Sequence, residues 1–215
     1  MKTEKVKSRS VIFTFDSSAS WNLNIHLILG GQNSYVIDTG LGSQSMEPVL
    51  KHLQPGKPVI VINTHYHWDH VWGNAVFSGS PIIAHSLCRQ RLQEGWDEMV
   101  QKHGEFISGD VKKHLPNLVF DDGLYFPDDG IRLFYTPGHT LDGISVLDEM
   151  DGVLNIGDNI GDDMEHIMPD LECEPDIYAA TLQQYLDTGA EAYVSGHNIV
   201  LGRDTLERVL DELSV

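Results

Sequence analysis

The segment His65-x-His67-x-Asp69-His70 constrains this chain most, because four side chains able to bind a metal fall within six residues. It directly follows residues 58–63 (PVIVIN), a continuous apolar run that predicts a strand buried on both faces. Along a straight strand, alternate side chains point to opposite faces, so these four can meet at one point only where the chain turns. We therefore expect a loop at residues 64–70, at the end of a central strand.

Three more candidate ligands follow predicted strands in the same way. Each comes directly after a glycine, which permits close backbone approach and unusual dihedral angles. They are His139 after the strand expected at 131–136, Asp158 after 153–156, and His197 after 191–195. A lone histidine or aspartate is more often structural, but four strand ends that deliver ligands predict one shared metal site. Imidazole and carboxylate groups together suit zinc, and also iron or manganese.

The rest of the chain predicts strands and helices with short connections. Strands are expected at 11–15, 23–29, 34–38, 81–84, 117–120, 124–126 and 144–148, and helices at 44–53, 86–104, 176–187 and 203–212. Residues 105–117 are ambiguous and compatible with a mobile flap. Because no linker or low-complexity stretch interrupts the pattern, we expect a single domain over residues 1–215.

The net charge and the lengths of the apolar runs limit the classes of partner that this chain can have. The chain has 14 basic and 32 acidic residues, a formal net charge of −18, which disfavours nucleic acid and anionic lipid as partners. The N-terminal apolar run VIFTF is too short for a signal peptide, and no run approaches the length of a membrane span. We therefore expect a cytoplasmic protein with Cys88 and Cys173 as free thiols and a small-molecule substrate. A homodimer is compatible with this composition.

The motifs, taken in order, resemble those of the metallo-β-lactamase superfamily. They span residues 38–197 and comprise Asp38-Thr39-Gly40, the HxHxDH segment, Pro137-Gly138-His139, Gly157-Asp158 and Gly196-His197. The resemblance implies an α/β fold: a four-layer αβ/βα sandwich, in which two mixed β-sheets face each other and helices flank them.

The same resemblance implies a site for two divalent metal ions, zinc in the first place and iron or manganese as alternatives. His65, His67 and His139 would bind the first ion, Asp69, His70 and His197 the second, and Asp158 both. Asp38 would accept a hydrogen bond from a ligating histidine and fix its orientation.

The implied activity is metal-dependent hydrolysis. Two close cations lower the pKa of a shared water to about 7, so hydroxide is available to attack an ester, thioester, lactone or related bond. Asp69 is the candidate catalytic residue, because one of its carboxylate oxygens can stay free to orient the nucleophile or pass a proton.

The substrate stays open at this level. Residues 64–74 are similar to glyoxalase II, but the chain ends soon after His197, without that family's glutathione-binding helical domain. Lactonases of the superfamily carry a tyrosine just after the bridging aspartate, whereas Asn159-Ile160-Gly161 follow here. True β-lactamases lack the bridging aspartate. We expect loops 17–24, 86–116 and 160–175, with His166 beside the pocket, to determine specificity.

Two other classes of function remain as alternatives. A persulfide dioxygenase-like oxidoreductase would use a single iron held by His65, His139 and Asp158. A non-enzymatic metal-binding module is the second alternative, although such relatives usually lose ligands and this sequence keeps all seven.

Overall fold

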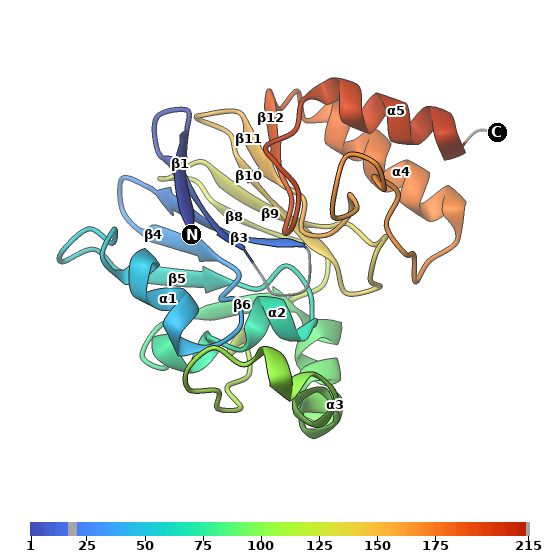
Figure 1. The fold of residues 1–215 in the computed structure, drawn as a ribbon. Coiled ribbons are helices and arrows are strands. Elements are labelled where there is room, and N and C mark those ends of the chain that lie inside the picture. Colours follow the sequence, from blue (N-terminus) through green and yellow to red (C-terminus); the bar gives the residue numbers. More distant parts are fainter. Residues whose placement is uncertain (17–20, 214–215) are drawn as a thin grey trace.

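Two β-sheets lie face to face with helices on both outer sides in the computed structural model, which describes residues 1–16 and 21–213 (Figure 1). The first sheet has seven strands in the order β1-β2-β3-β4-β5-β6-β7. Its strands are β1 (Lys2–Val6), β2 (Ser10–Asp16), β3 (Asn22–Leu29), β4 (Ser34–Ile37), β5 (Val59–Ile62), β6 (Ile82–His85) and β7 (Leu118–Phe120). Strands β1 to β4 pair antiparallel, and β4 to β7 pair parallel.

The second sheet has five strands in the order β12-β11-β10-β9-β8. They are β8 (Gly123–Phe126), β9 (Ile131–Tyr135), β10 (Ile144–Asp148), β11 (Val153–Asn155) and β12 (Ala192–Val194). All neighbours pair antiparallel except β11 and β12, which are parallel. Strands β9, β11 and β12 therefore run in the same direction.

The helices lie outside the two sheets (Figure 1). They are α1 (Ser43–Leu50), α2 (Trp68–Val71), α3 (Ser86–His103), α4 (Pro175–Asp187) and α5 (Arg203–Leu213), with 3-10 turns at Asn74–Phe77 and Gly104–Phe106. Helices α1, α2 and α3 accompany the first sheet, and α4 and α5 cover the second. None of the helices in the described part of the chain is long and apolar enough to cross a membrane.

Three apolar layers hold these four structural layers together. Because side chains alternate along a strand, Tyr35 and Ile37 of β4 face the second sheet, whereas Val36 packs toward Met46 and Val49 of α1. The inter-sheet layer is completed from the other side by Ile131, Leu133, Ile144 and Val146. The third layer joins the outer face of the second sheet to α4 and α5. The predicted four-layer αβ/βα sandwich is confirmed.

Strand direction places the polar turns together. In each parallel pair the carboxyl ends lie at the same edge, so the turns after β4 and β5 are neighbours, as are those after β11 and β12. Strand β9 runs in the same direction as β11, one strand away, so the turn after it lies at the same edge of the sheet. Backbone hydrogen bonds from Ile144 N to Thr64 O (2.9 Å) and from Asn24 N to Gly196 O (2.6 Å) join the two sheets near this edge. All turns that carry predicted ligands therefore open onto one side of the sandwich.

Two elements differ from the sequence-based prediction. Strand β1 was not expected, because KTEKV has little apolar character; it lies at the edge of the first sheet, where lysines are tolerated in exposed positions. The segment 64–70 was expected to be a loop, but Trp68–Val71 form the short helix α2. The helical turn allows Val71 and Trp72 to be fully buried while Asp69 and His70 face the site.

His26 is a buried residue of the core that gives the fold a dependence on pH. It lies on β3 and is 1% exposed, its Nδ1 is 3.5 Å from Asn155 Nδ2, and its Nε2 has no hydrogen-bond partner among the described atoms. Burial lowers the pKa of this imidazole to about 3, because the charged form has no compensating carboxylate.

We predict that His26 destabilises the fold as the pH falls. An unfolded histidine has a pKa near 6.5, so below that pH the unfolded state takes up a proton that the folded state refuses. The loss reaches about 2 kcal/mol at pH 5. Urea unfolding of metal-free protein at pH 7.5 and pH 5 measures it, with His26→Gln as the comparison. Equal losses of stability in the two proteins would contradict the prediction.

Candidate metal centre

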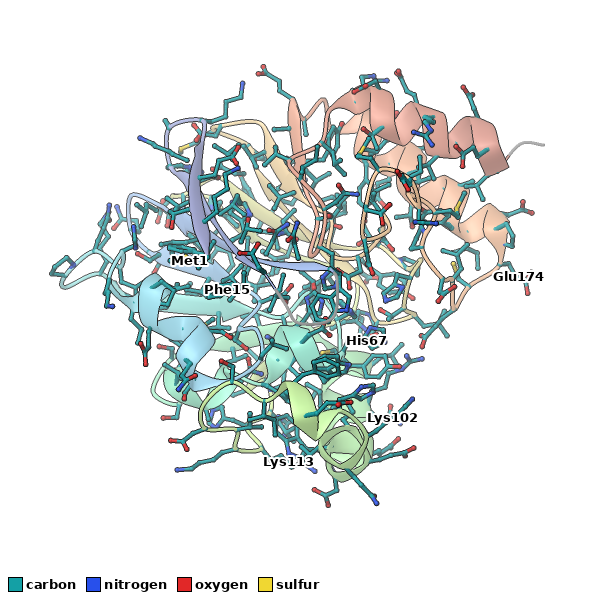
Figure 2. All side chains as sticks on the ribbon, viewed as in Figure 1. Met1, Phe15, His67, Lys102, Lys113 and Glu174 are labelled. Carbon is teal, nitrogen blue, oxygen red and sulfur yellow. The ribbon has the colours of Figure 1, made fainter. Side chains whose placement is uncertain are left out.

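The seven side chains predicted to be ligands come together in space. Figure 2 labels one of them, His67. They form two groups whose potential ligand atoms lie within 4.8 Å of one another. The first group is His65, His67, His139 and Asp158, and the second is Asp69, His70 and His197. Strands β5, β9, β11 and β12 end just before them, and α2 carries Asp69 and His70.

Distances within the first group match a metal coordination sphere. His67 Nδ1 is 3.1 Å from His139 Nε2, and His65 Nε2 is 3.5 Å from Asp158 Oδ2. Ligands at zinc bond lengths of about 2.0–2.1 Å in a tetrahedron are separated by roughly 3.3 Å. The separations observed here therefore leave room for one ion.

The second group has the same spacing. Asp69 Oδ2 is 3.4 Å from His197 Nε2 and 3.7 Å from His70 Nε2. Asp158 joins the groups, since its Oδ2 is 3.1 Å from both His70 Nε2 and His197 Nε2 as well as 3.5 Å from His65 Nε2. One carboxylate oxygen thus lies among the ring nitrogens of both groups.

Hydrogen bonds to the outer ring nitrogens determine which nitrogen faces the centre. His139 Nδ1 donates to the Asp170 carbonyl (2.9 Å), and His197 Nδ1 donates to the Asn22 carbonyl (2.6 Å). With the proton on Nδ1, a neutral imidazole presents the Nε2 lone pair inward, where a metal would accept it. The sequence contained no signal for Asn22 and Asp170, because the backbone carbonyl of any residue can accept such a hydrogen bond.

Asp38 orients two further histidines. Its Oδ2 accepts a hydrogen bond from His70 Nδ1 (2.9 Å) and another from Thr64 Oγ1 (2.8 Å), and its Oδ1 accepts from Thr64 N (2.8 Å). The Thr64 hydroxyl, having donated to Asp38, accepts from His65 Nδ1 at 3.0 Å. Asp38 has a φ of 62°, a left-handed conformation that aspartate tolerates better than most residues. The hydrogen bond expected between Asp38 and a histidine is present.

A glycine before the last histidine is required by close packing. A Cβ on Gly196 would lie 2.1 Å from Asp158 Oδ1 and 2.7 Å from His70 Cε1. Any other residue would push these two side chains out of the centre. The pattern of strand, glycine and ligand therefore has a steric cause at this position.

Buried polar atoms without partners indicate that a cation belongs here. His65 Nε2, His70 Nε2 and Asp158 Oδ1 are buried and have no hydrogen-bond partner in the described structure. Burying such atoms without compensation is costly, and a divalent cation satisfies imidazole and carboxylate together. The donor set therefore fits two divalent metal ions.

The pKa values divide the histidines into two kinds. Burial lowers the pKa of His65 well below its usual range, and burial together with His139 lowers that of His67 to about 4. Burial also opposes charge on His197, but Asp158 and Asp69 outweigh it and raise its pKa to about 9. The same balance, dominated by Asp158, raises the pKa of His70. The carboxylates thus hold positive charge around Asp158.

Two cavities adjoin the centre. One, of about 310 Å³, is lined by His139, Asp158 and residues of the 161–170 segment, among them the exposed His166, which therefore lies at the pocket as expected. The other, of about 440 Å³, lies beside His67 and includes Met99. Trp96, on the same helix as Met99, is buried in the core. Residues 17–20 of the expected specificity loop 17–24 lie outside the described residues.

Known proteins share both the sequence pattern and the fold. An N-acyl homoserine lactonase from Bacillus cereus is 33% identical over 105 residues, 47% of this chain and 38% of the relative. A hydroxyacylglutathione hydrolase from Maricaulis maris is 30% identical over 102 residues, 46% of this chain and 32% of the relative. The aligned region thus covers well under half the length of these curated relatives.

Solved structures agree over nearly the whole chain. The DIM-1 metallo-beta-lactamase superposes with a TM-score of 0.78 at 18% identity, covering 99% of this chain and 96% of that one. An archaeal superfamily protein from Sulfolobus tokodaii gives 0.70 at 18% identity, covering 95% and 86%. The family model of the metallo-beta-lactamase superfamily matches residues 21–197. From its sequence motifs, its four-layer fold and this match, the chain belongs to the metallo-β-lactamase superfamily.

Proposed function

We propose that the protein is a hydrolase that uses two divalent metal ions, most simply zinc, to cleave an ester, thioester or lactone. The observation that carries the proposal is the position of Asp158 Oδ2 between the two ligand groups. When bound, the metal pair supplies an activated water and an electrophile for the scissile carbonyl. Hydrolysis then consumes one water and releases an acid and an alcohol or thiol.

The chain's own residues divide the remaining work. His65, His67 and His139 hold one side of the site, and His70 and His197 hold the other, each oriented by the hydrogen bonds described above. Asp69, 7% exposed, is the candidate catalytic residue, because it borders the site and, among the described residues, no outer hydrogen bond holds both of its oxygens. It would orient the attacking water or carry a proton to the leaving group.

The substrate class rests on two considerations. The curated relatives are named as a lactonase and a thioester hydrolase, which favours acyl substrates. In this chain Asn159 follows Asp158; its Oδ1 accepts from His139 N (2.8 Å) and its Nδ2 donates to the Thr136 carbonyl (2.9 Å). Residue 159 therefore supports the His139 turn and offers no hydroxyl to the substrate, so thioesters are the first class to test.

Metal stoichiometry tests the ligand assignment. His197→Ala leaves the four donors of the first group intact, so we expect it to retain about one ion per chain. Asp158→Ala removes the ligand that both groups share, so we expect this variant to lose metal from both groups. Metal analysis after gel filtration, with circular dichroism to verify the fold, measures this. Asp211→Ala, on the exposed face of α5, is the control and should keep two ions. Two tightly held ions in Asp158→Ala would refute a bridging role.

Activity tests the reaction class. Wild-type protein loaded with zinc, manganese or iron is assayed on thioesters, lactones, phosphodiesters and β-lactams. We expect thioester or lactone hydrolysis that is lost on metal removal and in His67→Ala. Oxygen consumption with a thiol substrate by protein holding a single iron would instead identify the mononuclear oxidoreductase.

Asp38 should tune the site without binding metal. Asp38→Asn keeps a residue that tolerates the left-handed backbone but removes the charge that faces His70. We expect metal affinity or kcat/KM to fall about 10–100-fold with the fold intact. Asp122→Asn, at an exposed position, provides the comparison. Unchanged affinity and rate in Asp38→Asn would show that the charge has no part in orienting His70.

A further inference from the structure

Gly95 lies in the interior of α3, where its presence has no structural explanation within the protein. Glycine is among the least favourable residues for a helix interior, and α3 continues for eight more residues to His103. A Cβ built on Gly95 meets no atom within 4 Å. Neither tight packing nor a special backbone angle therefore requires a glycine at this position.

The space beside Gly95 is the cavity of about 440 Å³ that borders the metal centre. Its walls are shared by α3 and by the residues around the metal ligand His67: Tyr66, Trp68, Gly95, Met99, Lys102 and His103. Because Gly95 has no side chain, the cavity stays open next to His67. An apolar arm of a substrate whose reacting bond lies at the metal centre can extend into it along Trp68 and Met99.

The part of the cavity wall that α3 forms carries a cation, Lys102. Figure 2 shows Lys102 on α3, on the side of the helix near His67. Most described arginines and lysines contact carboxylates or carbonyls, but Lys102 forms no ion pair within the described part of the chain. Beside it, the His103 ring stacks on Trp68 with centroids 4.8 Å apart, which fixes that ring at the pocket wall.

Glu98 is the one acidic residue of this cavity. It lies one helical turn before Lys102 but is not within ion-pair distance of it, so it does not neutralise the ammonium group. A carboxylate beside Lys102 is attracted by the ammonium and repelled more weakly by the more distant Glu98. Removing the charge of Glu98 should therefore strengthen anion binding, whereas removing the charge of Lys102 should weaken it.

We propose that this cavity binds a short apolar arm of the substrate that ends in a carboxylate, with Gly95 providing the space and Lys102 recognising the anion. The inference rests on the proposed hydrolase function and specifies its substrate: an acyl group that carries a second, free carboxylate. Trp68 and Met99 contact the arm, and Lys102 donates to its end.

A larger side chain at position 95 tests whether the cavity beside Gly95 holds the substrate arm. Gly95→Leu should fold as well as the wild type or better, because leucine favours helix and its Cβ meets no atom within 4 Å. We expect it to raise KM for a five-carbon acyl thioester and leave acetyl thioester hydrolysis and metal content unchanged. Gln101→Leu, exposed on the same helix, is the matched control. Equal effects on the acetyl and five-carbon substrates would overturn the assignment of the cavity.

Two substrates that differ only in a terminal carboxylate test whether Lys102 recognises that charge. Glutaryl and pentanoyl thioesters of one thiol have equal chain length and differ in the terminal carboxylate. We expect wild-type kcat/KM to favour the glutaryl substrate by about threefold, as for an ion pair formed with an exposed lysine. Lys102→Gln should abolish the preference, Lys102→Arg should retain it, Glu98→Gln should increase it, and the distant Lys51→Gln should leave it unchanged. A preference that persists in Lys102→Gln would overturn the proposal.

Binding separates this inference from the hydrolase proposal. Glutaric acid monoanilide and pentanoic anilide contain no labile ester. Calorimetry with these two compounds measures the affinity of the pocket in metal-loaded protein, whether or not the protein hydrolyses a substrate. Tighter binding of the anionic anilide that is lost in Lys102→Gln supports the subsite even if no thioester is hydrolysed, in which case only the function fails. Active protein without this difference in affinity would leave the function standing and reject the subsite.

Discussion

The buried carboxylate of Asp158 is the group around which the site is organised. It is 8% exposed, and Oδ2 lies within 4.0 Å of the ring nitrogens of His65, His70, His139 and His197. A buried charge is tolerated only when opposite charge or a metal compensates it. The pKa of Asp158 falls well below its usual range because these histidines outweigh the cost of burial. Both sheets contribute to this compensation, so the site holds their ends together.

Backbone geometry at the edge of the sandwich also helps to bring Asp158 and the histidines together. Asp38 takes a left-handed conformation, and Gly196 leaves the space into which Asp158 and His70 extend. Such local costs are sustained because the apolar layer between the sheets is large and fully buried. The stability of the sandwich thus supports a strained and polar edge.

Helix α3 shows a related compromise between stability and function. Its buried face, with Cys88, Leu92 and Trp96, packs into an apolar cluster with Val71, Trp72 and Ala84, whereas the face near His67 carries Gly95 and Lys102. The glycine weakens the helix, and Lys102 forms no ion pair with any of the described residues of this strongly acidic chain. Both residues line the cavity beside the metal centre, where the proposed substrate arm would contact them.

The sequence by itself determined the seven candidate ligands and most of the elements. His65, His139, Asp158 and His197 each follow an apolar run with strand character, and local pattern is sufficient to recognise that arrangement. It did not reveal β1, whose KTEKV pattern lacks apolar alternation, or the helical turn at Trp68–Val71, which forms because Val71 and Trp72 reach the core. Only the tertiary structure decided that Asp158 lies between the two histidine groups, that the carbonyls of Asn22 and Asp170 orient His197 and His139, and that Gly95 opens onto His67. The reason is that these relations join residues distant in the chain, and strand order and packing, which no local pattern encodes, bring them into contact.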